Sequence, residues 1–360
     1  MPKCALLHNH LCMGTDNKWR VCCKFQGDPR PDISSMSYKT FKSLDQYKNV
    51  VETMKTDWHP GCRICKETEE DGRAESLRQV SNREFSQIDG IESIELSLSI
   101  DCNLKCRMCG PKYSTKWVDI IDQNPPLIRT QDFDPYDPDH HFRPYSVSDI
   151  LGDKDLSRLQ MVKFLGGEPF VTQQIYDLFD LLDQRKIIHN VDFQTNTNCT
   201  IFPEKSLKHL AKFRRIVVTL SIDGHGGLND YIRDGRPWKS VMDTLKKWRQ
   251  YREEHHNCIL LLVPSVQAYN VHDLSNLKRL ADDNGIKFKF QYVRAPKHFS
   301  LNALPPEYLT SVRDEINCID IDKAVFDNEQ FQLLKKFTRM LDLAYGKDIK
   351  DYIPKLAEYF

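Results

Sequence analysis

The sequence predicts an α/β fold with a parallel sheet, preceded by a small cysteine-rich segment. Six runs of apolar or alternating residues are typical of strands, and they lie at 91–100, 160–165, 190–195, 215–222, 258–266 and 286–293. Amphipathic stretches typical of helices lie between several of them, at 173–184, 205–213, 240–255 and 274–284. Strand, helix and strand repeated in this way predict right-handed crossovers and parallel pairing. The pattern alone does not distinguish a closed barrel from an open arc.

Length and charge place the chain among ordinary globular proteins. Its 360 residues suffice for one large α/β domain and a smaller one. The 51 Lys and Arg residues balance the 51 Asp and Glu residues, so no net charge attracts nucleic acid or an anionic membrane. No apolar run reaches the length of about 18 residues that a membrane span needs, and the start lacks the pattern of a secretory signal. We therefore expect a cytoplasmic protein without a membrane partner. The sequence gives no strong nucleic-acid signal, although the overall balance leaves a local basic patch open.

The cysteines are concentrated at one end of the chain. Of the twelve, nine lie within the first 109 residues, at Cys4, Cys12, Cys22, Cys23, Cys62, Cys65, Cys102, Cys106 and Cys109. A reducing compartment disfavours disulfides, so such crowding favours metal binding. We expect a cysteine-rich domain over 1–88, the parallel sheet over 89–300 and a helical extension over 301–360. Because long apolar runs are few before residue 88, that domain is expected to bury little core and to depend on metal.

Three of these cysteines form a compact motif directly after the first predicted strand. Cys102, Cys106 and Cys109 have the spacing C-x3-C-x2-C. Three thiolates on one loop reach three irons of a [4Fe-4S] cluster and leave the fourth iron without a protein ligand, whereas ferredoxin-type sites supply four cysteines per cluster. The alternative is a structural zinc site with a fourth ligand elsewhere. Other polar residues also follow predicted strands, at the sheet edge where α/β proteins place their sites: Gly166-Gly167-Glu168, Asn196, Asn198 and Asp223.

The cysteine motif resembles that of the radical SAM superfamily, and the resemblance extends over most of residues 91–295. It implies a partial (β/α)6 TIM-like barrel. It also implies a [4Fe-4S] cluster on Cys102, Cys106 and Cys109 that reduces S-adenosylmethionine (SAM). The resulting 5′-deoxyadenosyl radical would abstract hydrogen from a substrate, which makes the chain an oxidoreductase-like enzyme. An electron donor such as flavodoxin or ferredoxin is the expected partner.

The same resemblance implies the residues that bind SAM. Gly166-Gly167-Glu168-Pro169 is similar to the motif that binds the methionine amino group, and a carboxylate suits an ammonium. The remaining expected contacts come from later strand ends and from the residue before the third cysteine, and they are Met108, Asn196, Asn198, Ser221, Asp223 and Asn270. Met108 stands where an aromatic residue is frequent, and its thioether is able to pack against adenine. Each polar residue, taken alone, is equally compatible with a strand-end cap or a turn.

The amino-terminal cysteines predict a second metal site. Cys62 and Cys65 form a C-x2-C pair, which with two separate cysteines suffices for an iron–sulfur cluster or zinc. The preferred set is Cys4, Cys22, Cys62 and Cys65, with Cys23 as the rival of Cys22. The segment is similar to the auxiliary-cluster domains called twitch and SPASM, although those generally follow the barrel. The resemblance implies an auxiliary iron–sulfur cluster, expected to be [4Fe-4S]. Its role is either to bind substrate through an open iron or to accept an electron from a substrate radical, and four cysteine ligands favour electron transfer.

Three functions remain open from the sequence. The first is oxidation or cross-linking of a peptide, because many enzymes with twitch or SPASM domains modify peptides. The second is a radical reaction on a small metabolite or nucleotide, and the third is a noncatalytic iron–sulfur electron carrier or metal-binding scaffold. Glu168 and the polar strand-end residues disfavour the carrier, which needs no SAM pocket. Cys12 is open as a spare thiol, a ligand or a catalytic residue, and 126–145 as a solvated insertion or a lid.

Two further expectations concern the region after the fourth strand and the tail. Tyr231, Arg233, Asp234 and Trp238 either face the substrate or cap and pack helices. The tail over 328–358 is amphipathic and is expected to form helices that pack on the sheet.

Overall fold

A computed structural model describes residues 1–72, 75–123, 145–315 and 324–360. Its main sheet has eight strands in the order β2-β1-β3-β4-β5-β6-β7-β9, and every neighbouring pair is parallel except β1 and β2. Six of these strands coincide with the six predicted runs, and β5 extends two residues beyond the end of its run at 195: β3 Ser93–Ser97, β4 Met161–Leu165, β5 Asp192–Thr197, β6 Arg215–Leu220, β7 Cys258–Leu262 and β9 Lys287–Phe288. The predicted parallel α/β sheet is confirmed. A second, small sheet pairs β8 Ser265–Val266 with β10 Gln291–Tyr292.

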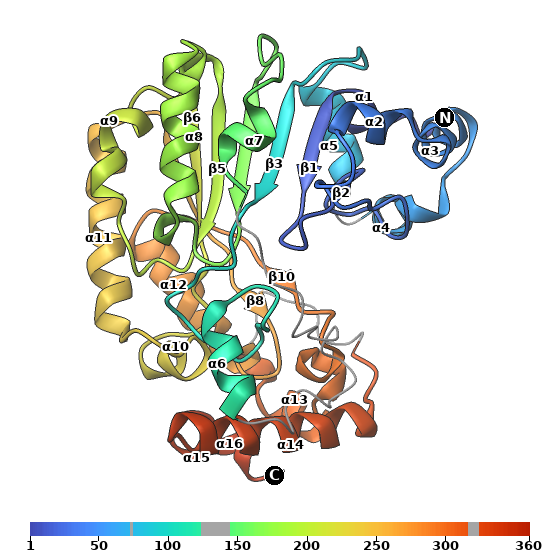
Figure 1. The fold of residues 1–360 in the computed structure, drawn as a ribbon. Helices are drawn as coiled ribbons and strands as arrows, with labels where there is room; N and C mark the ends of the chain where they lie inside the picture. Colours follow the sequence, from blue (N-terminus) through green and yellow to red (C-terminus); the bar gives the residue numbers. More distant parts are fainter. Residues whose placement is uncertain (73–74, 124–144, 316–323) are drawn as a thin grey trace.

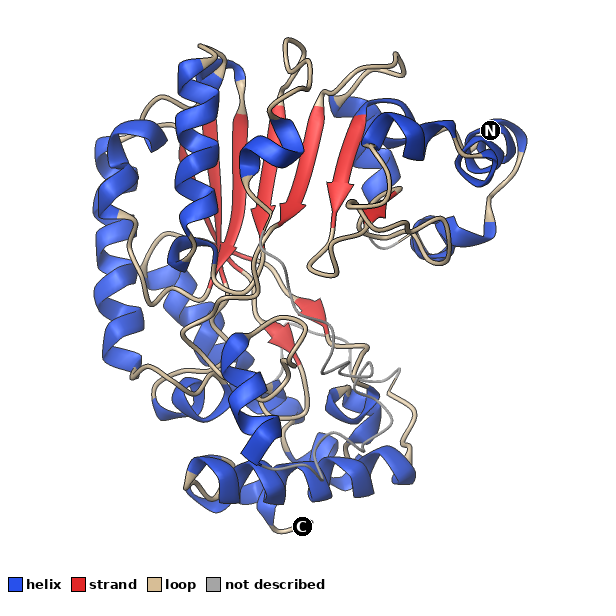
Figure 2. Cartoon of the chain, in the orientation of Figure 1, coloured by secondary structure: helices blue, strands red, loops and turns tan. Residues whose placement is uncertain are grey.

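The two faces of the sheet differ in polarity. Helices cover one face (Figures 1 and 2), where Val162, Phe164 and Val218 are completely buried. The predicted helices there are α8 Gln173–Gln184, α9 Leu207–Leu210, α11 Trp238–Glu254 and α12 Leu274–Asp283. On the opposite face Glu95 and Lys163 stand side by side in register on β3 and β4. Alternation along each strand therefore leaves a polar inner face next to the carboxyl ends.

The amino-terminal segment belongs to the same sheet and the same core. Strand β1 His10–Met13 pairs in parallel with β3, and β2 Trp19–Arg20 pairs with β1. The segment's helices are α1 Leu6–Asn9, α2 Tyr38–Ser43, α3 Asp45–Thr56, α4 Arg63–Asp71 and α5 Leu77–Glu84, with a 3-10 turn, η1, at Pro60–Cys62. Leu11, Phe41 and Val50 are completely buried in the main core. The expectation of little core was wrong, because the buried residues are spaced singly along helices instead of in runs.

The carboxyl-terminal helices lie beyond the carboxyl ends of the strands. Helix α14 Asn328–Tyr345 contacts the 3-10 turns η7 Lys297–Phe299 and η8 Leu301–Ala303. Figure 1 shows it below the strand ends together with α15 Ile349–Tyr352 and α16 Pro354–Ala357. The helical tail is confirmed, but it packs beyond the strand ends and not on a sheet face. The remaining helices near the site are α6 Thr115–Gln123, α7 Val147–Leu151, α10 Gly227–Ile232 and α13 Pro306–Ser311.

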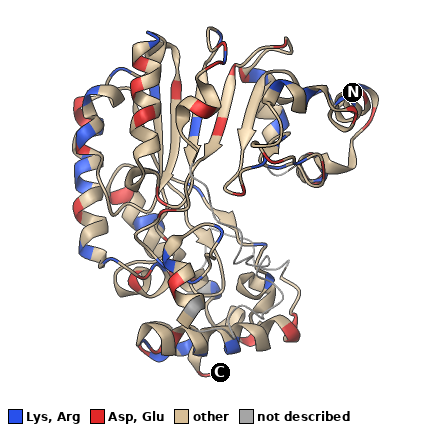
Figure 3. Cartoon of the chain, viewed as in Figure 1, with Lys and Arg blue, Asp and Glu red and all other residues tan. Residues whose placement is uncertain are grey.

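Surface charge and apolar length give no sign of a specialised surface. Lys and Arg alternate with Asp and Glu along the outer helices (Figure 3), in keeping with the balanced composition. Among the described residues, no helix combines the length and the apolar character that crossing a membrane demands.

Candidate functional site

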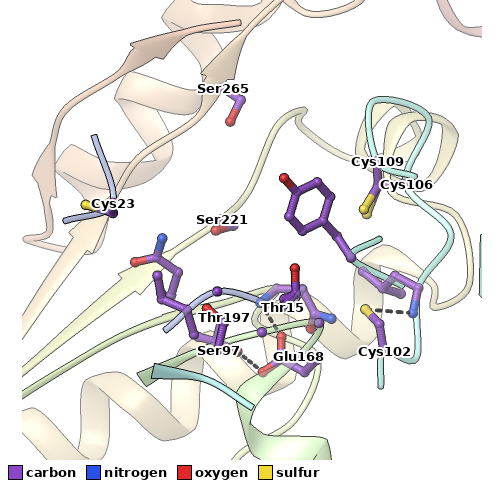
Figure 4. A pocket seen from close by; sticks show the side chains of 18 of the residues that line it. Thr15, Cys23, Ser97, Cys102, Cys106, Cys109, Glu168, Thr197, Ser221 and Ser265 are labelled. Carbon is purple, nitrogen blue, oxygen red and sulfur yellow. Dashed lines mark hydrogen bonds between the residues drawn. The ribbon is translucent and has the colours of Figure 1, made fainter. Parts of the chain in front are cut away.

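A pocket of about 380 Å³ opens at the carboxyl ends of the strands (Figure 4). Its lining comes from the amino-terminal segment, from β3 and the loop after it, from the ends of β4 to β6, and from Arg233 and Ser265. Its predicted site residues are Cys102, Cys106, Met108, Cys109, Gly166, Gly167, Glu168, Asn196, Asn198 and Ser221. Ten of the twelve residues expected to hold the cluster or SAM thus line one cavity.

Gly166 and Gly167 bring the end of β4 into close contact with the backbone that leads into the loop of the three cysteines. The amide of Gly167 donates to the Ser99 carbonyl at 3.0 Å, and the amide of Glu168 donates to the Asp101 carbonyl at 2.7 Å. A Cβ on Gly167 would lie 2.2 Å from the Asp101 oxygen, and Gly166 has a φ of +149°. Only glycine allows this approach. The close contact joins backbone to backbone and sets Glu168 beside the cysteines.

Glu168 is buried at the base of the pocket and is held by hydrogen bonds. Its carboxylate accepts from the Thr197 hydroxyl at 2.8 Å (Figure 4) and from the Asn198 amide at 2.7 Å. Burial raises its pKa to about 7, against the lowering effect of these bonds. A positively charged ligand would favour the ionised form. The carboxylate is therefore suited to an ammonium group in the pocket.

The two asparagines at the end of β5 have different roles. Asn196 is exposed, and its side chain lines the pocket. Asn198 donates to the Asn103 side chain at 2.8 Å, and its oxygen accepts from the Thr200 hydroxyl. Asn198 thus ties the end of β5 to the cysteine loop.

Asp223 and Asn270 do not line the pocket. Asp223 is completely buried, where it accepts from the guanidinium of Arg233 at 2.7 Å and from the Ser265 amide at 2.7 Å. Asn270 closes a turn by accepting from the Gln267 amide at 2.8 Å and donating to the Ser265 carbonyl. Arg233 and Ser265 line the pocket instead. A buried carboxylate such as Asp223 needs a cation beside it, and this requirement points to Arg233. No feature of the sequence singles out Ser265.

The cysteine loop is anchored from the side of the carboxyl-terminal helices. The Arg107 side chain has no exposed surface, and its guanidinium donates to Asp342 on α14 at 2.6 Å and to the Tyr231 carbonyl at 2.8 Å. The Tyr345 hydroxyl donates to the Lys105 carbonyl at 2.9 Å. Of the two roles left open for Tyr231, substrate contact or packing, the structure supports packing, with the guanidinium 3.6 Å from its ring centre.

The chemistry of the three thiols suits a metal cluster. Burial raises the pKa of Cys109 to about 12 and that of Cys106 well above its ordinary value. The thiols are consequently protonated without metal, and ligation has to release their protons. Three sulfurs, a buried carboxylate and a pocket of this size fit a [4Fe-4S] cluster together with SAM.

A second, smaller cavity lies in the amino-terminal segment and contains the other cysteines. It is lined by Cys4, Cys22, Cys62 and Cys65, with apolar neighbours that include Leu7, Phe25 and Trp58. Burial raises the pKa of Cys4 to about 11 and that of Cys62 to about 12. Four thiols around an apolar cavity fit a four-cysteine cluster. Across the described ranges, no three His, Cys, Asp or Glu side chains are arranged to hold a single metal ion.

Cys23 faces away from this second cavity. It lines the large pocket together with Cys12 and Glu95, and Figure 4 shows it across the pocket from Cys106 and Cys109. The structure therefore groups Cys22, and not its rival Cys23, with the other three amino-terminal cysteines. Cys12 is buried beside Cys23 and away from the second cavity. Cys199 and Cys258 are buried in the core, and residues 126–144 of the predicted insertion or lid lie outside the described residues.

Comparison with known proteins gives a family match for the part of the chain that builds the large pocket. Residues 96–267 match the model of the radical SAM superfamily. Similar solved structures include native anSMEcpe with bound AdoMet, at 15% identity, TM-score 0.39 and coverage of 71% of this chain and 62% of the other. Another is SuiB of Streptococcus suis bound to the precursor peptide SuiA, at 17% identity, TM-score 0.38 and coverage of 80% and 60%. This chain thus matches about 60% of each of these proteins.

Curated proteins yield no match. The family match falls on the strands and loops that build the large pocket, from Leu96 in β3 to Gln267 after β8. The three cysteines, the Gly-Gly-Glu motif and the strand-end residues Asn196 and Ser221 all lie within it. Residues 96–267, slightly less than half of the chain, therefore match the radical SAM superfamily.

Proposed function

We propose that Cys102, Cys106 and Cys109 hold a [4Fe-4S] cluster in the large pocket and that SAM binds beside it. The bound pair supplies reductive cleavage of SAM to a 5′-deoxyadenosyl radical that takes hydrogen from a substrate. The observation that carries the proposal is the set of backbone bonds from Gly167 and Glu168 to the cysteine loop. These bonds set a buried carboxylate beside three thiols within one cavity.

The residues around the cavity have distinct proposed tasks. Glu168 accepts the methionine ammonium, while Asn196 and Ser221 offer polar groups to the rest of SAM. Met108 presents its thioether to the adenine. Asp223 and Asn270 act behind the pocket surface, through Arg233 and Ser265.

The proposed substrate is a peptide, whose side chain is oxidised or cross-linked. A volume of about 380 Å³ is near the lower end of the range for pockets of small molecules, so a cluster and SAM would fill most of it. Space for one side chain at the mouth suits a segment of a larger molecule. The amino-terminal side of the pocket, with Arg20, Cys23 and Glu95, would then contact this side chain.

We further propose an auxiliary [4Fe-4S] cluster on Cys4, Cys22, Cys62 and Cys65, which would supply one-electron transfer when bound. The four thiols line one cavity with apolar neighbours, and this arrangement supports a four-cysteine site. Cys22 and Cys23 are consecutive, so only one peptide unit separates this site from the substrate side of the pocket.

The decisive experiment is anaerobic reconstitution with iron and sulfide, followed by dithionite and SAM. We expect 5′-deoxyadenosine from the wild-type chain and none from the variant in which Cys102, Cys106 and Cys109 are all alanine. A wild-type chain that holds its iron and sulfide but forms no 5′-deoxyadenosine would contradict the proposal. That outcome would favour a noncatalytic electron carrier.

A second experiment addresses the substrate class. Genes adjacent to this one provide candidates, and each encoded peptide or metabolite is added to the reconstituted enzyme with SAM. An oxidised or cross-linked peptide is expected to lose two hydrogens, one to the 5′-deoxyadenosyl radical and one as a proton whose electron the auxiliary cluster would accept. Mass spectrometry detects this loss as a mass decrease of about 2 Da. A reaction confined to a small metabolite or nucleotide would contradict the peptide assignment and leave the radical chemistry intact.

A further inference from the structure

Arg233 brings a positive charge to one of the three cysteine sulfurs. Its Nη1 lies 3.8 Å from Cys106 Sγ, within the range of a hydrogen bond to sulfur. Only 12% of its side chain is exposed, and it lines the large pocket. Because water screens little at such a site, the charge acts strongly on its neighbours.

Asp223 fixes the direction of this guanidinium. One carboxylate oxygen accepts from Arg233 Nε at 2.8 Å and from Nη2 at 2.7 Å. The other oxygen accepts from the Ser265 amide at 2.7 Å. Asp223 has no exposed surface, so both of its oxygens are committed and the third guanidinium nitrogen, Nη1, is left pointing to Cys106.

Three other charged groups near the loop are already paired elsewhere. Arg107 is bound to Asp342, and Lys105 lies 3.0 Å from Asp234. Glu168 accepts from Thr197 and Asn198. Among the described residues, Arg233 is the cation whose guanidinium donates a hydrogen bond to a cysteine sulfur of the loop.

We propose that Arg233 is a positioning residue that raises the reduction potential of the cluster on Cys102, Cys106 and Cys109, and this inference rests on the function proposed above. Reduction adds a negative charge to the cluster. A cation and an N–H group directed at a ligand sulfur stabilise the reduced state more than the oxidised state. Asp223 holds the guanidinium in place while its own negative charge offsets part of the effect.

A purely structural role predicts a different result. The ion pair joins the loop after β6 to the end of α10, where Arg233 also donates its amide to the Asn229 carbonyl at 2.7 Å. If the pair only closed this loop, loss of either partner would have the same effect on the cluster. If the charge acts on the cluster, Arg233→Met and Asp223→Asn change the potential in opposite directions.

The test is a redox titration of the full-length, reconstituted protein followed by electron paramagnetic resonance. The relevant signal is the one that changes when SAM is added, because that cluster has the open iron. At a fixed potential, we expect Arg233→Met to lower its reduced-to-oxidised ratio at least tenfold, which equals about 59 mV for one electron. Asp223→Asn should raise the ratio, and Arg233→Lys should fall between wild type and Arg233→Met.

Two further variants complete the design. Arg233→Gln is a second neutral replacement, used if Arg233→Met does not retain its cluster. Lys239→Met removes the same charge from an exposed pair with Asp243, and no change in the ratio is expected. An unchanged ratio in the neutral Arg233 variants, or an equal fall in Asp223→Asn, would overturn the inference. Absence of any SAM-responsive signal in the wild type would instead overturn the proposed function on which the inference depends.

Discussion

The buried ion pair between Arg107 and Asp342 gives a quantitative prediction for Asp342→Ala. The Arg107 side chain is completely buried and that of Asp342 is 12% exposed, so solvent screens the pair weakly. Removal of the carboxylate leaves the guanidinium buried with the Tyr231 carbonyl as its remaining hydrogen-bond acceptor. It also removes the acceptor for the Ile349 amide, at 2.9 Å. Breaking one partner of a buried pair costs about 3–5 kcal/mol.

The assay is urea unfolding followed by tryptophan fluorescence. At a slope of about 3 kcal/mol per molar urea, the expected loss lowers the midpoint by about 1 M or more. Trp117 packs against Phe337 of α14 and donates to the Cys106 carbonyl at 2.8 Å, so its emission reports the same region. The iron content of the reconstituted variant should fall as well, because the loop of the three cysteines loses its anchor.

Two controls separate the buried charge from general damage. Asp243→Ala removes a carboxylate from an exposed pair with Lys239 and should cost about 0–1 kcal/mol. Arg107→Met combined with Asp342→Leu removes both charges and should recover most of the lost stability. A loss below about 1 kcal/mol for Asp342→Ala, or a double variant as unstable as the single one, would refute the reasoning.

Three further predictions follow from the two cavities. Cys22→Ser should lose about half of the iron that two [4Fe-4S] clusters contain. Cys23→Ser should retain the full iron content. Equal iron in the two variants would contradict the assignment of Cys22. Gly167→Ala places a Cβ 2.2 Å from the Asp101 oxygen and should abolish SAM binding in equilibrium dialysis, while Gly227→Ala, with its nearest neighbour at 3.7 Å, should bind normally. Burial raises the pKa of Glu168 from 4.5 to about 7, so SAM affinity should increase as the pH rises through about 7, and Glu168→Gln should bind weakly at every pH. The folding stability of the protein without SAM depends on pH in the opposite direction. Protonated Glu168 stabilises the fold fully below pH 4.5, and this contribution is lost as the pH rises through about 7.

Local patterns explain which parts of the fold were predictable. The six strands follow from alternation and apolar runs, and the radical SAM assignment follows from the spacing of Cys102, Cys106 and Cys109, which the family match bears out. The core of the amino-terminal segment was missed because Phe41 and Val50 join it through contacts with residues distant in sequence. The helical spacing of Tyr47, Val50 and Met54 in α3 marks an apolar face, but it does not show which distant residues this face packs against.

The choice between neighbouring residues also required the structure. Cys22 and Cys23 are equivalent in spacing, and only the fold shows that Cys22 lines the second cavity and Cys23 the large pocket. Asp223 was expected at the pocket surface because it follows a strand. Asp223 is instead buried against Arg233, and Arg233, ten residues later in the sequence, lines the pocket.

The peptide unit between Cys22 and Cys23 has a consequence for maturation of the enzyme. A peptide group is planar and rigid, so a shift of one residue on metal insertion is transmitted to the next. Ligation at Cys22 therefore restricts where the Cys23 thiol can lie on the opposite side of the same segment. If the proposed auxiliary cluster forms, loading of the amino-terminal site would therefore also fix the position of Cys23 in the wall of the large pocket.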